Sequence, residues 1–331
     1  MKIVVLPSDL AGCGHYRMIY PGEAVAALGI DVQIVSDGIL IPDAVISSSD
    51  DKPWTILEGT VPDADVVVIQ RPSHPSVEAA IRYLKSKGIR IVVDIDDRFE
   101  AIQPSNKAAY YYKSKEIRCL NMSIANADVV TCSTPELAEL HGGILLENCI
   151  PESYLAIPDE HENVIGWSGT LAVHRDDLRV VGSGVSRAVA DTDWGFRVVG
   201  ESEGVGNELG LSGDPEQTGW LPIADYPAEV AKLGIGIAPL ADTVFNRSKS
   251  WLKALEYSAL GVPFVATDLP EYRRLGLGLL ASNQRQWKGM LSTLLNDPMR
   301  REDMRLAGRA AARQWTYEKH AERWADVWLG L

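Results

Sequence analysis

The sequence is poor in cysteine and in long apolar runs, and each shortage narrows what the chain can be. It has four cysteines, all in the first half and none spaced as CxxC, so neither a disulfide framework nor a cysteine-based zinc site is expected. The first apolar run, residues 3–6, is too short for a secretory signal, and no run reaches the roughly 18 apolar residues that span a bilayer. We therefore expect a cytoplasmic protein with reduced thiols and no transmembrane segment.

Positive charge is also scarce. Lysine and arginine total 32 against 45 aspartates and glutamates, which gives a formal net charge of −13. This balance argues against general attraction to nucleic acid or anionic membranes, although it leaves room for a local basic patch. A length of 331 residues with 46% hydrophobic content is typical of two globular domains of about 150 residues each.

Short runs rich in valine and isoleucine alternate with segments of helical period along the whole chain. The predicted strands are residues 3–6, 32–35, 66–70, 89–94, 129–132 and 144–146, and then 164–167, 196–199, 219–221, 235–239, 263–267 and 277–280. The predicted helices are 18–28, 77–87, 107–126 and 135–141, and then 176–190, 223–232, 250–260, 283–296 and 298–314. Strands without alternation, separated by helices, predict an α/β fold with parallel sheets covered on both faces.

A break in both periods at residues 148–158 marks the boundary between the halves. We expect domains at 1–152 and 153–314, followed by a separate helix at 315–331. Trp315, Trp324 and Trp328 recur at helical spacing in this last segment, so it is expected to dock rather than fray. Packing on its own domain is equally compatible with the sequence.

Two places in the second half are suited to an anion, because ligands of open parallel sheets bind beyond the carboxyl ends of strands. The first is the sequence GWSGT at 166–170, where the amides of Gly169 and Thr170 would face a diphosphate and His174 or Arg175 would add charge. An ordinary tight turn accounts for this glycine equally well.

The second place is the helix predicted at 250–260, with Ser248 or Ser250 as its N-cap. Lys249, Lys253 and Glu256 recur at i, i+4 and i+7 and would share one face. Lysines near the amino end favour a diphosphate, and Glu256 would accept hydrogen bonds from ribose hydroxyls. A solvated face with an ordinary lysine–glutamate pair is the alternative.

At this helix the sequence resembles the retaining GT-B glycosyltransferases of family four and its relatives (glycosyl transferases group 1). The stretch SKSWLKALEYSALGVPFVATD, residues 248–268, is similar to their donor-site segment. Glu256 matches the second of two family glutamates, and Ser248 stands where the first would be. Further resemblances are GWSGT at 166–170, GIAPLADTVFN at 236–246, ADVVTCSTPELAE at 127–139 and VVDIDDRFE at 92–100.

The resemblance implies two Rossmann-like doubly wound parallel-sheet domains facing a cleft, with the last helix crossing back to the first domain. It implies transfer of a sugar from a nucleoside diphosphate sugar with retained anomeric configuration. A UDP-sugar is favoured over a GDP-sugar, with no tightly bound cofactor. The nucleotide-sugar contacts would come from Gly169, Thr170, Arg175, Arg247, Ser248, Lys249, Ser250, Lys253 and Glu256.

The first half would then hold the acceptor. Gly14, His15 and Arg17 open the first helix, and His74 follows another strand. The resemblance makes all of them candidates for acceptor or phosphate contact. A capping or packing role is as compatible with His15 and Arg17.

Asp94, Asp96 and Asp97 form a D-x-D-D run after a strand. Such carboxylates can bind magnesium, but members of the resembled family need no metal for catalysis, and we expect none here. One carboxylate would instead orient an acceptor hydroxyl or an arginine. With the resemblance in view, His15, Asp96 and Lys249 are the expected catalytic residues.

Residues 106–115 interleave lysines with three tyrosines, including Tyr111. Such a segment can recognise an acceptor or be a plain exposed helix face. The acceptor itself (glycan, protein, lipid or modified nucleic acid) is not named by the sequence, and neither is the oligomeric state. A catalytically silent nucleotide-sugar-binding protein and a nucleotide-sugar epimerase of the same fold are the alternative functions.

Overall fold

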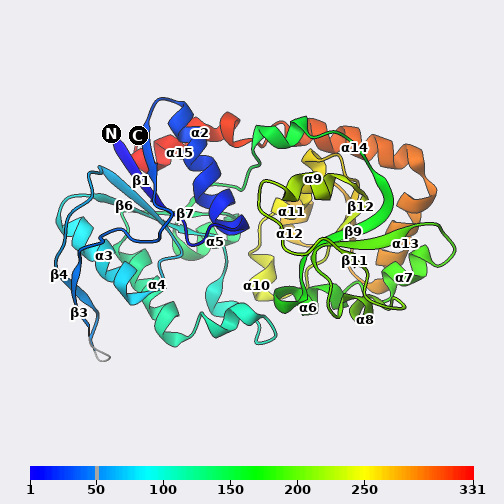
Figure 1. The fold of residues 1–331 in the computed structure, drawn as a ribbon, viewed down its shortest axis with the longest axis horizontal. Coiled ribbons are helices and arrows are strands. Elements are labelled where there is room, and N and C mark those ends of the chain that lie inside the picture. The colour runs from blue at the N-terminus through cyan, green and yellow to red at the C-terminus, as the bar shows by residue number, and fades with distance from the viewer. Residues whose placement is uncertain (49–51) are drawn as a thin grey trace. The chain divides into compact units, whose positions relative to one another are not determined.

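The computed structural model describes residues 1–48 and 52–331 (Figure 1). Its contacts divide the chain into two units. Unit 1 comprises Met1–Ile102, Ala109–Asn148 and Tyr317–Leu331, and unit 2 comprises Gln103–Ala108 and Cys149–Thr316. No helix among the described residues is both long and apolar enough to cross a membrane.

Unit 1 is built on a sheet of six parallel strands. Their order across the sheet is β2 (Asp31–Ile34), β1 (Lys2–Leu6), β5 (Val66–Gln70), β6 (Arg90–Ile95), β7 (Val129–Cys132) and β8 (Ile144–Leu145). All six had been predicted within one or two residues. Strands β5 and β6 are buried along almost their whole length, which explains why their sequences do not alternate.

Helices cover this sheet. The principal ones are α2 (Tyr20–Ala27), α3 (Pro75–Ser86), α4 (Ser114–Asn126), α5 (Pro135–His141) and α15 (Tyr317–Leu329). Helix α15, at the end of the chain, packs beside α2 (Figure 1) and buries Trp324 and Trp328. Thr134 caps α5 by accepting the N–H of Leu137.

Several short elements of unit 1 had no clear sequence signal. The first helix begins earlier than predicted, as α1 (Gly12–Gly14) and the π-helical turn η1 (His15–Ile19). An antiparallel pair, β3 (Val45–Ser47) and β4 (Thr55–Glu58), was not predicted. Both of its strands are largely exposed, so they lack the apolar run that identifies a buried strand.

Unit 2 repeats the plan with a second sheet of six parallel strands. The order is β11 (Glu216–Gln217), β10 (Gly195–Glu201), β9 (Glu162–Thr170), β12 (Leu233–Ala238), β13 (Phe264–Thr267) and β14 (Leu279–Ala281). The strand expected at 219–221 is wrong: the strand lies at Glu216–Gln217, and Gly219 ends it with a φ of 73°, outside the range of a strand.

The helices of unit 2 fill the connections between its strands. Those expected are α9 (Tyr226–Ala231), α11 (Leu252–Ala259), α13 (Gln284–Asn296) and α14 (Pro298–Ala312). The single helix expected at 176–190 is wrong: the chain forms two helices there, α6 (Leu171–Arg179) and α7 (Gly184–Val189). Helices α8 (Val205–Leu209), α10 (Val244–Arg247) and α12 (Pro270–Leu275) were not predicted, because one or two turns carry too little periodicity to detect.

The strand order identifies where each sheet can bind a ligand. In unit 2 the chain first adds strands on one side of β9 and then on the other side, beginning with β12. In unit 1 the same reversal falls between β1 and β5. Open α/β sheets bind ligands beyond the carboxyl ends of the strands at this switch point. The candidate sites are therefore the carboxyl ends of β9 and β12, and those of β1 and β5.

Candidate functional site

Helix α11 begins beyond the carboxyl end of β12 in unit 2. Its N-cap is Trp251, whose side chain makes no capping hydrogen bond, so the expected cap at Ser248 or Ser250 is wrong. The hydroxyl of Ser250 still lies 3.4 Å from the N–H of Leu252. Ser248 is fully buried, with its hydroxyl 3.4 Å from the carbonyl of Val244. A ligand contact at Ser248 stays a prediction.

Lys249 also differs from expectation. It lies in the turn before α11, so it does not share a helix face with Lys253 and Glu256. Its ammonium lies 4.4 Å from the centre of the Phe245 ring, a favourable cation–π distance.

Glu256 is the centre of a polar cluster that joins three elements. It is 2% exposed, and its carboxylate accepts hydrogen bonds from Tyr226 Oη at 2.9 Å and from Lys253 Nζ at 3.0 Å. Tyr226 Oη, from α9, also donates to or accepts from Ser168 Oγ at the end of β9, at 3.1 Å. Lys253 Nζ lies 2.8 Å from Tyr226 Oη. We call these four residues the Glu256 cluster.

Charge within the Glu256 cluster changes how its members titrate. Burial and the negative charge of Glu256 raise the pKa of Tyr226 well above its ordinary value, so its hydroxyl stays protonated. Burial lowers the pKa of Lys253, but the attraction of Glu256 outweighs it and the net pKa is raised. At neutral pH the cluster therefore holds an ammonium group whose side chain is still 31% exposed.

A second set of hydrogen bonds fixes the segment that leads into α11. Asp177 in α6 accepts from the N–H of Ala241 at 2.8 Å and from the side-chain amide of Asn246 at 2.6 Å. His174 lies 2.8 Å from the other oxygen of Asp177. These hydrogen bonds tie α6, which follows β9, to the segment that follows β12.

Gly169 and Thr170 are the last residues of β9 rather than part of a loop. Gly169 pairs with Gly200 of β10, and a Cβ on Gly200 would lie 2.2 Å from the carbonyl oxygen of Gly169. Only glycine permits this approach. Thr170 is the N-cap of α6 and accepts the N–H of Ala172, so the amino end of a helix opens directly beside the Glu256 cluster's Ser168.

Two of the predicted cations are more exposed. Arg175 has 53% of its side chain exposed and lies 3.9 Å from Glu208. Arg247 has 54% exposed and donates two hydrogen bonds to Asp242, at 2.6 and 3.0 Å. Each is therefore already close to a carboxylate.

In unit 1, Arg17 is an interior residue. It is 1% exposed and donates to both oxygens of Asp94, at 3.0 and 2.6 Å, and to Leu146 O and Asn148 Oδ1. Its guanidinium carbon lies 4.9 Å from the centre of a Trp324 ring. This arrangement corrects the expectation that Arg17 contacts an acceptor. It ties the first helix to β6 and to α15.

Asp96 pairs with an arginine that the sequence did not single out. Arg71 donates to its two oxygens at 2.5 Å each and lies 3.9 Å from Asp9 and 3.8 Å from Asp97. Among the described residues, Arg71 is the one non-glycine residue with positive φ, at 50°. This costly backbone conformation turns the end of β5 toward the carboxylates. The pairing agrees with one of the two roles expected for the aspartates, in which a carboxylate orients an arginine.

The remaining first-half candidates are Gly14, His15, His74 and Tyr111. His74 is the N-cap of α3 and accepts the N–H of Ser76; its contact with an acceptor stays a prediction. His15 Nδ1 lies 2.9 Å from Ala11 O. Gly14 packs so closely that a Cβ would lie 1.7 Å from Asp9 O. Tyr111 is 76% exposed.

Tyr226 and Arg71 are the residues that sequence reasoning missed. The partners of Tyr226 lie 30 and 58 positions away, and Arg71 is 25 positions from Asp96. A single sequence carries no signal for such pairs. Within residues 1–48 and 52–331, no group of three or more histidine, cysteine or acidic side chains is arranged to hold a metal ion.

Comparison with known proteins finds likeness in structure but none in sequence. No family model matches the chain, and neither does any curated protein. Among solved structures, the chain is similar to proteins of the GT-B fold class. The predicted fold class, α/β with two Rossmann-like parallel-sheet domains, is thereby confirmed.

Three of these structures are particularly similar. Anabaena HepE in complex with UDP-glucose has a TM-score of 0.68 at 13% identity, with 100% of both chains covered. A glycosyltransferase from Rickettsia africae ESF-5 has a TM-score of 0.65 at 12% identity, covering 99% of this chain and 97% of that one. S. aureus TarM, in complex with fondaparinux, α-GlcNAc-glycerol and UDP, has a TM-score of 0.61 at 12% identity, covering 80% and 55%.

Proposed function

We propose that the chain is a glycosyltransferase that takes its sugar from a UDP-sugar bound at the carboxyl edge of the unit 2 sheet. The observation that carries this proposal is the Glu256 cluster at the switch point. A buried carboxylate beside an ammonium group provides acceptors for ribose hydroxyls and positive charge for a diphosphate within one small site. HepE and TarM, which share the fold, were crystallised with UDP or UDP-glucose.

The geometry of the cluster supports a proposed role for each of its members. Glu256 accepts the ribose hydroxyls, and Tyr226 fixes the carboxylate by its 2.9 Å hydrogen bond. Lys253 and the amino end of α6 at Thr170 stabilise the departing diphosphate, since helix amino ends favour anions. Arg175 and Arg247, with more than half of each side chain exposed, exchange their present carboxylate partners for phosphate.

With the donor bound in this way, the reaction needs no covalent intermediate with the protein. No side chain in the Glu256 cluster is placed as a nucleophile, and the leaving phosphate takes the acceptor's proton. The sugar is then transferred with retention. Unit 1 binds the acceptor, and His15 and the Asp96–Arg71 pair contact it at the carboxyl edge of the unit 1 sheet.

A donor panel tests the proposal. The purified chain is incubated with UDP-, GDP- and ADP-sugars without added divalent metal, and release of nucleoside diphosphate and transfer products are followed by mass spectrometry. We expect release from a UDP-sugar, and retention read from the anomeric configuration of the product. Binding of UDP-sugars without transfer or hydrolysis would favour a silent binding protein, and a sugar altered at one carbon while still joined to UDP would favour an epimerase.

A further inference from the structure

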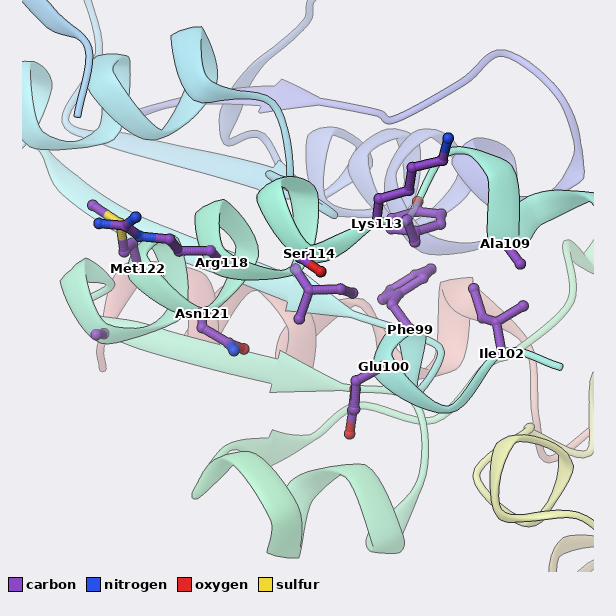
Figure 2. A pocket seen from close by; sticks show the side chains of 12 residues that line it. Phe99, Glu100, Ile102, Ala109, Lys113, Ser114, Arg118, Asn121 and Met122 are labelled. Atoms are coloured by element: carbon purple, nitrogen blue, oxygen red, sulfur yellow. The ribbon is translucent and has the colours of Figure 1, made fainter. Parts of the chain in front are cut away.

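Unit 1 contains a pocket of about 980 Å³ whose lining residues all belong to that unit. Figure 2 shows that Phe99, Glu100 and Ile102, from the segment after β6, form one wall. Helix α4 forms the other wall, with Ser114, Arg118, Asn121 and Met122. This volume lies at the upper end of the range for pockets that hold small ligands.

The lining of the pocket suits a hydrocarbon chain better than a sugar or a base. Its apolar surface is mainly aliphatic, from Ile102, Ala109, Ile117, Met122 and Ala125. The aromatic lining residue Phe99 already has a partner on its ring: Tyr112 stacks on it at 4.2 Å.

The Phe99 ring has a second partner, because the Arg71 guanidinium lies 5.2 Å from its centre. With 4% of the residue exposed, it offers little open face to a nucleobase. Burial also raises the pKa of Tyr112 to about 12, in keeping with apolar surroundings.

Two cations line the pocket, in a chain whose net charge is −13. The one carboxylate of the lining, Glu100, is already paired with Arg98 at 2.9 Å. Lys113 and Arg118 line the pocket and are exposed. Among the described residues neither forms an ion pair with a carboxylate. Next to them Tyr110 and Tyr111 are 73% and 76% exposed. Exposed tyrosines beside lysine and arginine are typical of surfaces that lie at a membrane interface.

We propose that this pocket binds the hydrocarbon chain of an anionic membrane lipid, with Lys113 and Arg118 at the headgroup and Tyr110 and Tyr111 at the bilayer interface. Given the proposed function, the acceptor is a lipid with a phosphate-bearing headgroup that is glycosylated at the membrane surface. Lipid binding itself does not require sugar transfer, so the two proposals fail separately.

Co-sedimentation with vesicles, without nucleotide, tests the surface. We expect binding to equimolar phosphatidylcholine–phosphatidylglycerol vesicles and little binding to phosphatidylcholine alone. Lys113→Glu with Arg118→Glu should weaken binding by about thirtyfold or more, from roughly fivefold for each basic side chain removed. Arg285→Glu with Lys288→Glu makes the same charge change on exposed positions of α13 in unit 2 and should leave binding almost unchanged. An equal loss of vesicle binding in the two double variants would overturn the proposal.

A second variant tests the pocket separately from its charge. Ala125→Trp places a large side chain in the pocket from an exposed helix position, with the thermal midpoint as the check on folding. It should abolish protection of the chain by farnesyl phosphate in a thermal-shift assay, whereas inorganic phosphate should protect neither protein. Unchanged protection by farnesyl phosphate in Ala125→Trp, or equal protection by inorganic phosphate, would overturn the role of the pocket.

Discussion

The carboxyl edges of the two sheets use the same backbone plan for different purposes. At the unit 1 edge, Arg17 and Arg71 are both paired with carboxylates, and the Arg17–Asp94 pair is fully buried. At the unit 2 edge, the ammonium of Lys253 keeps 31% of its side chain exposed beside a buried glutamate. All three cations are paired with a carboxylate, but Lys253 is 31% exposed against 1% for Arg17 and 12% for Arg71, so the cation of unit 2 is the more accessible to a ligand.

The comparison supports unit 2, rather than unit 1, as the site of the proposed anionic donor. A buried ion pair gives little net attraction to a ligand, because each charge already has its partner and would have to lose it. Unit 1 also gathers Asp9, Asp96 and Asp97 around the single guanidinium of Arg71. An edge with excess carboxylate suits hydroxyl groups of an acceptor better than a diphosphate.

The largest expected effect is on stability, at the unit 1 edge. Arg17→Met leaves Asp94 buried without its guanidinium partner and should lower the free energy of unfolding by about 3–5 kcal/mol, measured by urea denaturation. Arg17→Met with Asp94→Leu removes both charges and should recover most of the loss. If the single variant unfolds like the wild type, the pair does not hold the edge together.

The next effect is on donor binding, at the unit 2 edge. Glu256→Gln removes a charged acceptor worth about 1.5–3 kcal/mol, so UDP should bind about 10- to 100-fold more weakly in isothermal titration. Glu229→Gln is the matched control, because Glu229 forms the same i,i+3 pair with Lys232. The Lys232 carbonyl bonds the first residue of β9, at the opposite edge of the sheet, so this variant should keep its affinity.

A smaller change should follow loss of the Tyr226 hydroxyl. Tyr226→Phe keeps the ring but removes the hydrogen bond to Glu256, worth about 1 kcal/mol. We expect about a fivefold rise in KM for the donor with a smaller change in kcat, because the hydroxyl positions the carboxylate rather than touching the reacting atoms. An equal fall in kcat with unchanged KM would place Tyr226 in the chemistry instead.

The smallest expected effect is a change in stability at alkaline pH. The pKa of Lys253 is raised above its ordinary value of 10.5 in the folded chain, so the native state keeps this proton to higher pH than the unfolded state. Its contribution to stability is complete below pH 10.5 and is lost as pH rises through the raised value.

For a partly exposed pair that contribution is at most about 1 kcal/mol. Comparing unfolding midpoints of the wild type and Lys253→Met across this range isolates it. The difference between the two unfolding midpoints should shrink as the pH rises. A difference that grows would mean that the pKa of Lys253 is not raised in the folded chain.

The fold was largely predictable from sequence, and the site only in part. Buried strands such as Val66–Gln70 and long helices such as Gln284–Asn296 carry strong local patterns. The pairing of Lys253 with Glu256 follows from helical spacing. The spacing places Lys249 on the same face only for a helix that begins near residue 250, whereas α11 begins at Leu252.

What could not be predicted depends on contacts between distant segments. Arg17 and Asp94 are 77 positions apart, and their ion pair turns a candidate ligand contact into an interior residue. Tyr226 enters the cluster through the parallel order of β9, β10 and β12, which no local pattern specifies. The positive φ of Arg71 arises where a strand must turn sharply before Pro72.

The most direct measurement is a crystal structure of the chain soaked with UDP. The account predicts ribose hydroxyls within hydrogen-bond distance of the Glu256 carboxylate and the diphosphate beside Lys253 and Thr170. UDP bound at the carboxyl edge of the unit 1 sheet, with the Glu256 cluster unchanged, would contradict it.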